Sequence, residues 1–285
     1  MINAKSAAFA ALAATMALPG AASAQARAAA DLPIAVQLFT LRDHGTLEER
    51  LAAVQAAGVT AVETVGTHDL EAAEFKALLD AHGIEPIATH APIAALREDI
   101  SAVASFNKAI GNEVIIVPFL AEDMRPADAA GWVALGEELR SMSDALRAEG
   151  MVLGYHNHAF EMVEFDGRTA LEIMFEAAGP DLLAEIDVAW VARGGLDPAE
   201  YLGRFDGRLF AIHAKDNAPE GEAEDERGFK ALGEGVLDWS TILPAAEAAG
   251  ADWYIIEHDM PLDAAVVVQT GADFLSANLP EGVSR

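Results

Sequence analysis

The sequence of 285 residues contains no cysteine. This absence excludes a disulfide framework and a thiolate metal site, so any bound metal must use nitrogen and oxygen ligands. Basic residues are also few, with 18 Lys and Arg against 46 Asp and Glu and a net charge of −28. Such a charge opposes binding to a phosphate backbone, so we expect no nucleic-acid partner, and it disfavours an anionic substrate.

Long apolar segments are missing after the first residues of the chain. The opening stretch, MINAKSAAFAALAATMALPGAASA, has one lysine, a run of small apolar residues and a final A-x-A pattern. It predicts a secretory signal peptide over residues 1–24, cleaved before Gln25, and a periplasmic protein. No later segment is long enough to span a bilayer, so we expect no membrane association after cleavage.

From residue 33 onward, short apolar runs alternate with alanine-rich amphipathic stretches. Strands are predicted at 33–39, 59–65, 85–91, 113–119, 151–157, 182–187, 208–214 and 253–259. Helices are predicted near 46–57, 70–82, 96–111, 127–149, 168–178, 198–205, 238–249 and 262–278. Thr46 with Glu49 forms a capping-box pattern, and Gly150 and Gly250 can end two of the helices.

This strict alternation predicts an α/β fold, a single-domain (β/α)8 TIM barrel over residues 33–285 that follows a short tail at 25–32. The alternative is an open, doubly wound parallel sheet. Its glycine fingerprint, G-x-G-x-x-G, is absent from the sequence.

Polar residues gather where the predicted strands end, which in a barrel is the catalytic face. In chain order the strand ends carry Gln37, Glu63, His90, Pro118, His156 with His158, Asp187, His213 and Glu257. Because side chains alternate along a strand, Glu185 would point the same way as Asp187, and Lys215 the same way as His213.

Four of these residues, on strands five to eight, form a candidate metal site: His156, Asp187, His213 and Glu257. Neighbouring strands lie about 4.8 Å apart, so inward groups at equal height can reach one ion. The resulting set of two nitrogens and two oxygens suits Mn²⁺ or Zn²⁺, with Mg²⁺ or Co²⁺ as less favoured alternatives.

Each residue also has a purely structural interpretation. A histidine at a strand end can be a hydrogen-bonded core residue, Asp187 can cap a helix, and Glu257 can be a solvated loop acid. Lys215 can pair with Asp216 or another nearby carboxylate, and Trp190 can belong to the core. Four unrelated carboxylates and histidines meeting at one buried place would, however, be costly without a common partner.

Several motifs resemble the xylose isomerase-like TIM-barrel family of sugar phosphate isomerases and epimerases. They are VQLFTLRD, YHNHAFE, EIDVAWVARGG, IHAKD, LGEGVLDW and YIIEHD, and they cover nearly the whole chain in order. The resemblance implies a divalent metal held by Glu, Asp, His and Glu at the ends of strands five to eight. The last three positions correspond to Asp187, His213 and Glu257.

The first ligand departs from the family pattern, because His156 stands where many members have glutamate. Either His156 replaces that carboxylate, which we favour because strand residues hold their position, or Glu161 folds back from the following loop. Trp190 likewise stands where relatives carry histidine, and its ring suits stacking on a sugar.

The chemistry that such a site supports is proton removal from a carbon beside a carbonyl. His158 is the first candidate for the base and Glu161 the second, while Lys215 could donate to the developing oxyanion. The predicted substrate-binding residues are Gln37, Glu63, His90 and Trp190.

We therefore expect an enzyme, a sugar isomerase or epimerase acting on a neutral sugar or keto-sugar, with a homo-oligomer as an open possibility. A lyase that cleaves 3-keto-glycosides by elimination would use the same residues. A sugar-binding protein without turnover is an alternative of another class. A DNA repair enzyme of the endonuclease IV type is disfavoured by the acidic charge.

Overall fold

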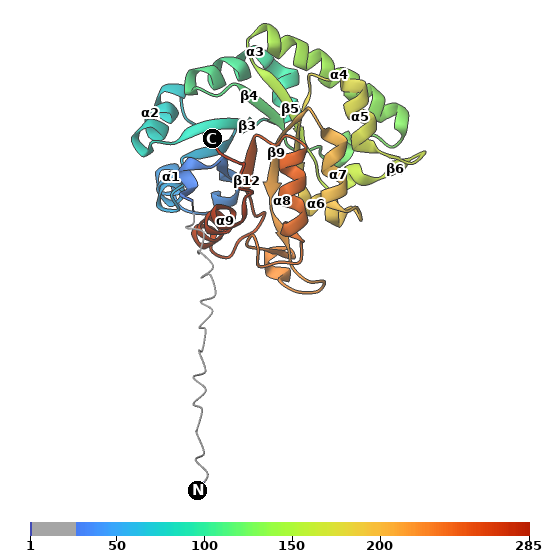
Figure 1. Ribbon diagram of the computed structural model, residues 1–285. Helices are drawn as coiled ribbons and strands as arrows, with labels where there is room; N and C mark the ends of the chain where they lie inside the picture. Colours follow the sequence, from blue (N-terminus) through green and yellow to red (C-terminus); the bar gives the residue numbers. More distant parts are fainter. Residues whose placement is uncertain (2–26) are drawn as a thin grey trace.

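A computed structural model describes Met1 and residues 27–285 (Figure 1). The predicted signal peptide from residue 2 onward and the first two residues of the predicted tail lie outside the described residues. None of the helices in the described part is long and apolar enough to cross a membrane.

Eight parallel strands form a closed barrel in the order β1, β12, β9, β8, β5, β4, β3, β2. Their bounds are β1 Ile34–Gln37, β2 Ala61–Val65, β3 Glu85–His90, β4 Val114–Val117, β5 Val152–His156, β8 Leu183–Asp187, β9 Leu209–Ala214 and β12 Trp253–Ile256. The predicted (β/α)8 barrel is confirmed, and the open doubly wound sheet is excluded.

Helices surround the barrel (Figure 1). The predicted ones are observed as α1 Leu47–Ala56, α2 Ala72–His82, α3 Ile93–Ile110, α4 Ala129–Ala148, α5 Ala170–Ala178, α7 Pro198–Leu202, α8 Trp239–Ala248 and α9 Ala264–Asn278. Short 3-10 turns occupy Ala29–Asp31, Leu38–Leu41, Glu122–Met124, Phe160–Met162, Gly203–Phe205 and Glu224–Glu226.

Three further elements decorate the loops at the carboxyl ends of the strands. A helical turn, α6 Val188–Arg193, follows β8 directly, and two small hairpins pair β6 Glu164–Phe165 with β7 Arg168–Thr169 and β10 Asp216–Asn217 with β11 Phe229–Lys230. These elements were not predicted, because four to six residues are too few for a hydrophobic period to be recognised.

The helix caps explain several boundaries. Thr46 Oγ1 accepts a hydrogen bond from the Glu49 amide, and the Glu49 carboxylate accepts one from the Thr46 amide, so the capping box is confirmed. Gly150 adopts the left-handed conformation at φ +78° just after α4, which lets the chain leave the helix. Helix α3 begins at Ile93 rather than residue 96, and Asp99 breaks its regularity with φ −154°.

Small residues fill the lower barrel, and polar ones form the layer above them. Ala35, Ala61, Ala88 and Ala211 are fully buried, and each lies two positions before a polar strand-end residue. Gly154 holds the same position below His156, where an added Cβ would lie 2.5 Å from the Ile116 side chain. Because side chains alternate along each strand, the polar layer lies above these small residues, at the carboxyl-terminal mouth of the barrel.

Candidate functional site

The polar layer brings together the four residues predicted to hold a metal: His156, Asp187, His213 and Glu257, here called the ligand group. Strand register sets their heights, since Asp187 pairs with His213. One donor atom from each residue lies within 4.8 Å of the donor atoms of the other three, and all four side chains are buried. His213 Nδ1 is 2.9 Å from Glu257 Oε2, and His156 Nε2 is 3.9 Å from Asp187 Oδ2.

The donor chemistry of the ligand group fits a divalent cation. It offers two imidazole nitrogens and two carboxylates, the mixed set that zinc and manganese accept. Asp187 Oδ2 is buried without a hydrogen bond, although the Lys215 ammonium lies 2.8 Å away as an ion pair. Its other oxygen, Oδ1, accepts from the Trp190 amide, so Asp187 also caps α6 as its structural interpretation predicted.

Two fully buried carboxylates, Glu63 and Glu185, lie beneath the ligand group and are called the lower carboxylates. Glu185 Oε1 accepts hydrogen bonds from His156 Nδ1 at 3.0 Å and His90 Nε2 at 2.8 Å, and it lies 2.9 Å from His213 Nε2. Glu63 Oε2 accepts from His213 Nε2 at 2.8 Å and from Gln37 Nε2 at 2.6 Å.

In each of the two histidine ligands, one ring nitrogen is bonded to a lower carboxylate and the other faces a carboxylate of the ligand group. His156 turns Nδ1 down to Glu185 and leaves Nε2 toward Asp187, whereas His213 turns Nε2 down and leaves Nδ1 beside Glu257. A second group with metal-ligand spacing, His90, His156, Glu185 and His213, would use His156 Nδ1 and His213 Nε2, which are bonded to the lower carboxylates. The ligand group uses the other two nitrogens, of which His213 Nδ1 faces its fellow ligand Glu257. The geometry therefore favours the ligand group as the metal position.

The buried histidines and carboxylates of this layer shift one another's pKa values. Burial alone would lower the pKa of His90, but the carboxylates of Glu63 and Glu185 raise it to about 9. Burial would raise the pKa of Glu185, yet the surrounding imidazoles, His213 first, lower it well below its ordinary value. Burial together with the charge of His213 lowers the pKa of His156 to about 3, which leaves that ring neutral and able to ligate.

Lys215 joins the ligand group from the side. Its Nζ lies 2.8 Å from Asp187, 2.6 Å from Glu257 and 2.6 Å from Asp259. The prediction of a nearby carboxylate is confirmed, whereas the pairing with Asp216 is wrong. The Asp216 carboxylate instead accepts hydrogen bonds from the amides of Gly233 and Leu237 at 3.1 Å and from Nε1 of the Trp239 indole at 2.8 Å. Asp259 was not singled out from the sequence; it is the last residue of the predicted strand at 253–259 and lies two positions after Glu257.

Neighbouring residues in the segment after β5 make different hydrogen bonds and have different roles. Asn157 Oδ1 accepts a 2.9 Å hydrogen bond from the Asp187 amide and so fixes the end of β8. Glu161 accepts from Tyr155 Oη and from the His158 amide, both at 2.8 Å, and burial raises its pKa to about 7. Glu161 thus braces the loop and belongs to neither group with metal-ligand spacing, whereas His156 belongs to both.

A cavity of about 640 Å³ opens above the ligand group at the barrel mouth. Its lining comprises Phe39, Val65, His90, Pro118, Phe119, Arg125, His156, His158, Ala159, Phe160, Trp190, Arg227, Glu257 and Asp259. Among the predicted catalytic and substrate-binding residues, His90, His158 and Trp190 reach this cavity, and His156 and Glu257 of the ligand group form part of its floor. Gln37 and Glu63 do not line it, because they bond to each other below.

His158 stands between the ligand group and the cavity walls. Its ring lies 5.1 Å from that of His156 and 5.2 Å from that of Trp190, measured between centroids. Its Nδ1 is buried without a hydrogen-bond partner in the described part of the chain. Burial, with a further contribution from His156, lowers its pKa well below the ordinary value, so the ring is neutral.

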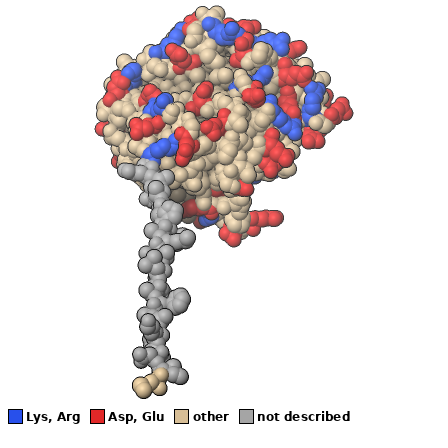
Figure 2. Space-filling model, viewed as in Figure 1, with Lys and Arg blue, Asp and Glu red and all other residues tan. Residues whose placement is uncertain are grey.

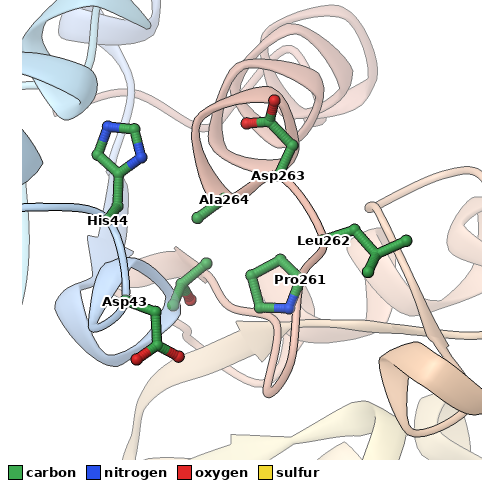
Figure 3. A pocket seen from close by; sticks show the side chains of 7 residues that line it. Asp43, His44, Pro261, Leu262, Asp263 and Ala264 are labelled. Carbon is green, nitrogen blue, oxygen red and sulfur yellow. The ribbon is translucent and has the colours of Figure 1, made fainter.

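A second hollow, of about 320 Å³, lies beside the mouth between the segment after β1 and the loop before α9 (Figure 3). Its labelled side chains include Asp43, His44 and Asp263, and no member of the ligand group lines it. Acidic side chains are scattered over the visible surface (Figure 2). The chemistry is therefore concentrated in the larger cavity.

Comparison with known proteins agrees with this architecture. The family model described as xylose isomerase-like TIM barrel matches residues 51–278. No match was found among curated proteins.

Solved structures share the fold at low sequence identity. A sugar phosphate isomerase/epimerase from Parabacteroides distasonis is 19% identical, with a TM-score of 0.74, and the match covers 90% of this chain and 97% of that one. The IOLI protein with a bound zinc atom is 17% identical, with a TM-score of 0.69 and coverages of 86% and 98%. The probable 3-DHS dehydratase AsbF from Bacillus anthracis is 14% identical, with a TM-score of 0.65 and coverages of 86% and 98%.

Proposed function

Because the chain belongs to the xylose isomerase-like TIM-barrel family, we propose that it is a divalent-metal-dependent sugar isomerase or epimerase. The reaction we infer moves a proton at a carbon beside the carbonyl of a sugar or keto-sugar. The observation that carries the proposal is the ligand group itself, four buried donors within 4.8 Å of one another directly below an open cavity. Solved relatives named as a sugar phosphate isomerase/epimerase and as a zinc-bound protein support the same reading.

In this proposal the metal ligands are His156 through Nε2, His213 through Nδ1, and the carboxylates of Asp187 and Glu257. A divalent cation held there would stabilise the negative charge that develops on the carbonyl oxygen of the substrate. We prefer Zn²⁺ or Mn²⁺ for the two nitrogen donors.

His158 is the residue that we assign to the proton transfer. It lines the cavity next to His156 and its ring is neutral, so it can accept a proton from the substrate carbon. The Lys215 ammonium faces the carboxylates of Asp187, Glu257 and Asp259 and does not line the cavity, so it would position the ligand carboxylates rather than hold a substrate oxygen. We leave Glu161 out of the reacting groups, because both its oxygens are engaged in bracing the loop.

A related candidate is elimination from a 3-keto-glycoside. Removal of the proton at C2 would be followed by loss of the C1 substituent, which leaves with the bonding electron pair and takes up a proton. The size of the cavity, about 640 Å³, favours a substrate that carries such a substituent. We also propose that the barrel acts outside the cytoplasm after removal of residues 1–24.

Solvent-deuterium exchange tests this function. Protein loaded with Mn²⁺ is incubated in D2O with sugars, keto-sugars and 3-keto-glycosides, and mass spectrometry follows label at the carbon next to the carbonyl. His158→Ala should retain metal but lose roughly 10²–10⁴ in exchange rate. His44→Ala, in the second hollow, serves as the matched control and should exchange normally.

The ligand assignment has a separate readout. Asp187→Ala and His213→Ala should each lose bound metal in elemental analysis while the barrel remains folded by circular dichroism. Exchange that continues in His158→Ala and disappears in metal-replete Glu161→Gln would move the base to Glu161. No exchange with any probe, together with tight sugar binding, would make the protein a sugar-binding module.

A further inference from the structure

The cavity has two tiers of different chemistry. Its floor is the polar ligand group, and its sides carry three phenylalanines, here called the aromatic wall: Phe39, Phe119 and Phe160. His158 separates the tiers, since its ring centroid lies 5.1 Å from that of His156 and 5.0 Å from that of Phe119. The wall therefore begins one imidazole ring above the floor.

The wall is exposed although it is apolar. Phe39 is 37% exposed and Phe119 is 43% exposed, whereas the core of the described chain buries its large apolar side chains almost completely. The three residues come from different loops, after β1, β4 and β5, and converge on one cavity. Exposed apolar side chains that gather in a concave site are typical of ligand contact.

Contacts hold the wall residues in place, Phe119 and Phe160 against each other and Phe39 beneath the Arg42 guanidinium, 4.1 Å from its ring centroid. Phe119 meets Phe160 edge to face, with centroids 5.9 Å apart at 87°. The Arg125 guanidinium lies 3.9 Å above the Phe160 centroid, and its Nε donates to the Leu120 carbonyl at 3.0 Å. The surface is thus preorganised, which reduces the entropy lost on binding.

We propose that this cavity binds a two-ring glycoside, with the reacting sugar ring on the ligand group and a second, glycosidically linked ring against the aromatic wall. The inference rests on the proposed function for the first ring and adds the substrate class. A single sugar ring on the floor would leave the wall exposed. The apolar face of a second sugar or of an aryl group covers it, because both pack favourably on phenylalanine.

Arg125 supplies the polar part of the outer tier. Within residues 27–285, no carboxylate pairs with it at 4 Å or less, although many other arginines of this acidic chain are paired. Its terminal N–H groups can therefore donate to oxygens of the second ring, while the face of the guanidinium stays on Phe160.

Calorimetric titration of the Mn²⁺-loaded mature chain tests the proposal. The probes are glucose, methyl and phenyl glucosides of both anomers, cellobiose and maltose. At least one two-ring probe should bind about tenfold or more tightly than glucose and the methyl glucosides. The phenyl glucosides and the disaccharides distinguish an aryl second ring from a sugar.

Substitutions test whether the aromatic wall causes the tighter binding of two-ring probes. Phe119→Ala should abolish the gain from the second ring and leave the affinity for the one-ring probes within about twofold. Val133→Ala on the outer helix α4 removes a side chain of similar exposure, 39%, and should change neither. Thermal unfolding followed by circular dichroism verifies that each variant is folded.

The inference is overturned if no two-ring probe binds more tightly than its one-ring parent. It is equally overturned if the gain survives in both Phe119→Ala and Phe39→Ala. Deuterium exchange separates this result from the proposed function. If two-ring probes bind more tightly but no deuterium exchange occurs, the two-ring site is retained and the proposed isomerase activity is rejected. If exchange occurs but two-ring probes bind no more tightly, the isomerase activity is retained and the two-ring site is rejected.

Discussion

Glu185→Gln is the substitution that most directly tests how the ligand group is held. The side chain keeps its shape and loses its charge, and it is fully buried. In the wild type, Glu185 Oε1 accepts from His156 Nδ1 and His90 Nε2 and lies 2.9 Å from His213 Nε2. We expect the variant to fold, to keep the ligand group, and to bind metal more weakly.

The magnitude follows from the number of bonds. A hydrogen bond to a charged group stabilises by about 1.5–3 kcal/mol and a neutral one by about 0.5–1.5 kcal/mol, so each weakened bond loses about 1 kcal/mol. The hydrogen bond from His156 and the charged contact with His213 then give about 2 kcal/mol, or roughly thirtyfold in Kd. Loss of an outer-shell partner typically costs about 10–100-fold in metal affinity, which agrees.

Competition with a chelating dye at fixed pH measures the Kd for Zn²⁺ and Mn²⁺. Glu176→Gln changes an acid on the exposed face of α5 and is the matched control. A Kd of Glu185→Gln within twofold of the wild type would refute the reasoning. So would a metal site that His90→Asn abolishes and Asp187→Asn preserves, because His90 belongs to the alternative group alone.

The remaining predictions concern stability, metal and export. Burial raises the folded pKa of Glu161 to about 7 from 4.5, so the protonated form is favoured. Its contribution, about 3 kcal/mol, should be complete below pH 4.5 and disappear as the pH rises through 7. Urea unfolding of Glu161→Gln should lack that dependence, and an unchanged pH profile would contradict it. Gly154→Ala should cost about 1–3 kcal/mol by overpacking against Ile116, which thermal unfolding measures. Restoring Mn²⁺ at about 100 times its Kd to chelator-treated protein should stabilise it by about 2.7 kcal/mol, and no shift in the unfolding midpoint would count against a folded-state site. Sequencing of protein from the native host should begin at or near Gln25, and an uncleaved Met1 would remove the export hypothesis.

Much of the fold and the ligand group could be predicted because both follow from local patterns. Alternation along a strand fixes which side chains face the barrel, and parallel pairing brings the strand ends to one mouth. His156, Asp187, His213 and Glu257 each lie within one residue of the end of a strand, so their meeting could be predicted without knowledge of the loops. The same logic gave the inward direction of Glu185, although its part in orienting the histidines was not recognised.

What could not be predicted lies in loops and in the choice between partners. Glu161 lies five residues after His156, and the sequence allows it to reach either the metal or the loop. Hydrogen bonds from the outward-facing Tyr155 and from the His158 amide hold Glu161 in the loop. These bonds depend on how the loop folds back, which the sequence pattern does not show. Phe119 falls at the end of the predicted strand at 113–119 and Arg125 in the loop after it, and their convergence with Phe39 depends on the closed barrel.

The lower carboxylates also have a consequence for how the barrel assembles. Glu63 on β2 is hydrogen-bonded to His213 on β9, a contact between residues 150 positions apart. Neither half of the chain contains both partners, so a half-formed barrel would enclose a charge without its counterpart or keep it in water. An unpaired buried charge is strongly destabilising, whereas the closed ring compensates it. The polar layer therefore penalises partly closed states and makes the formation of the barrel more nearly all-or-none.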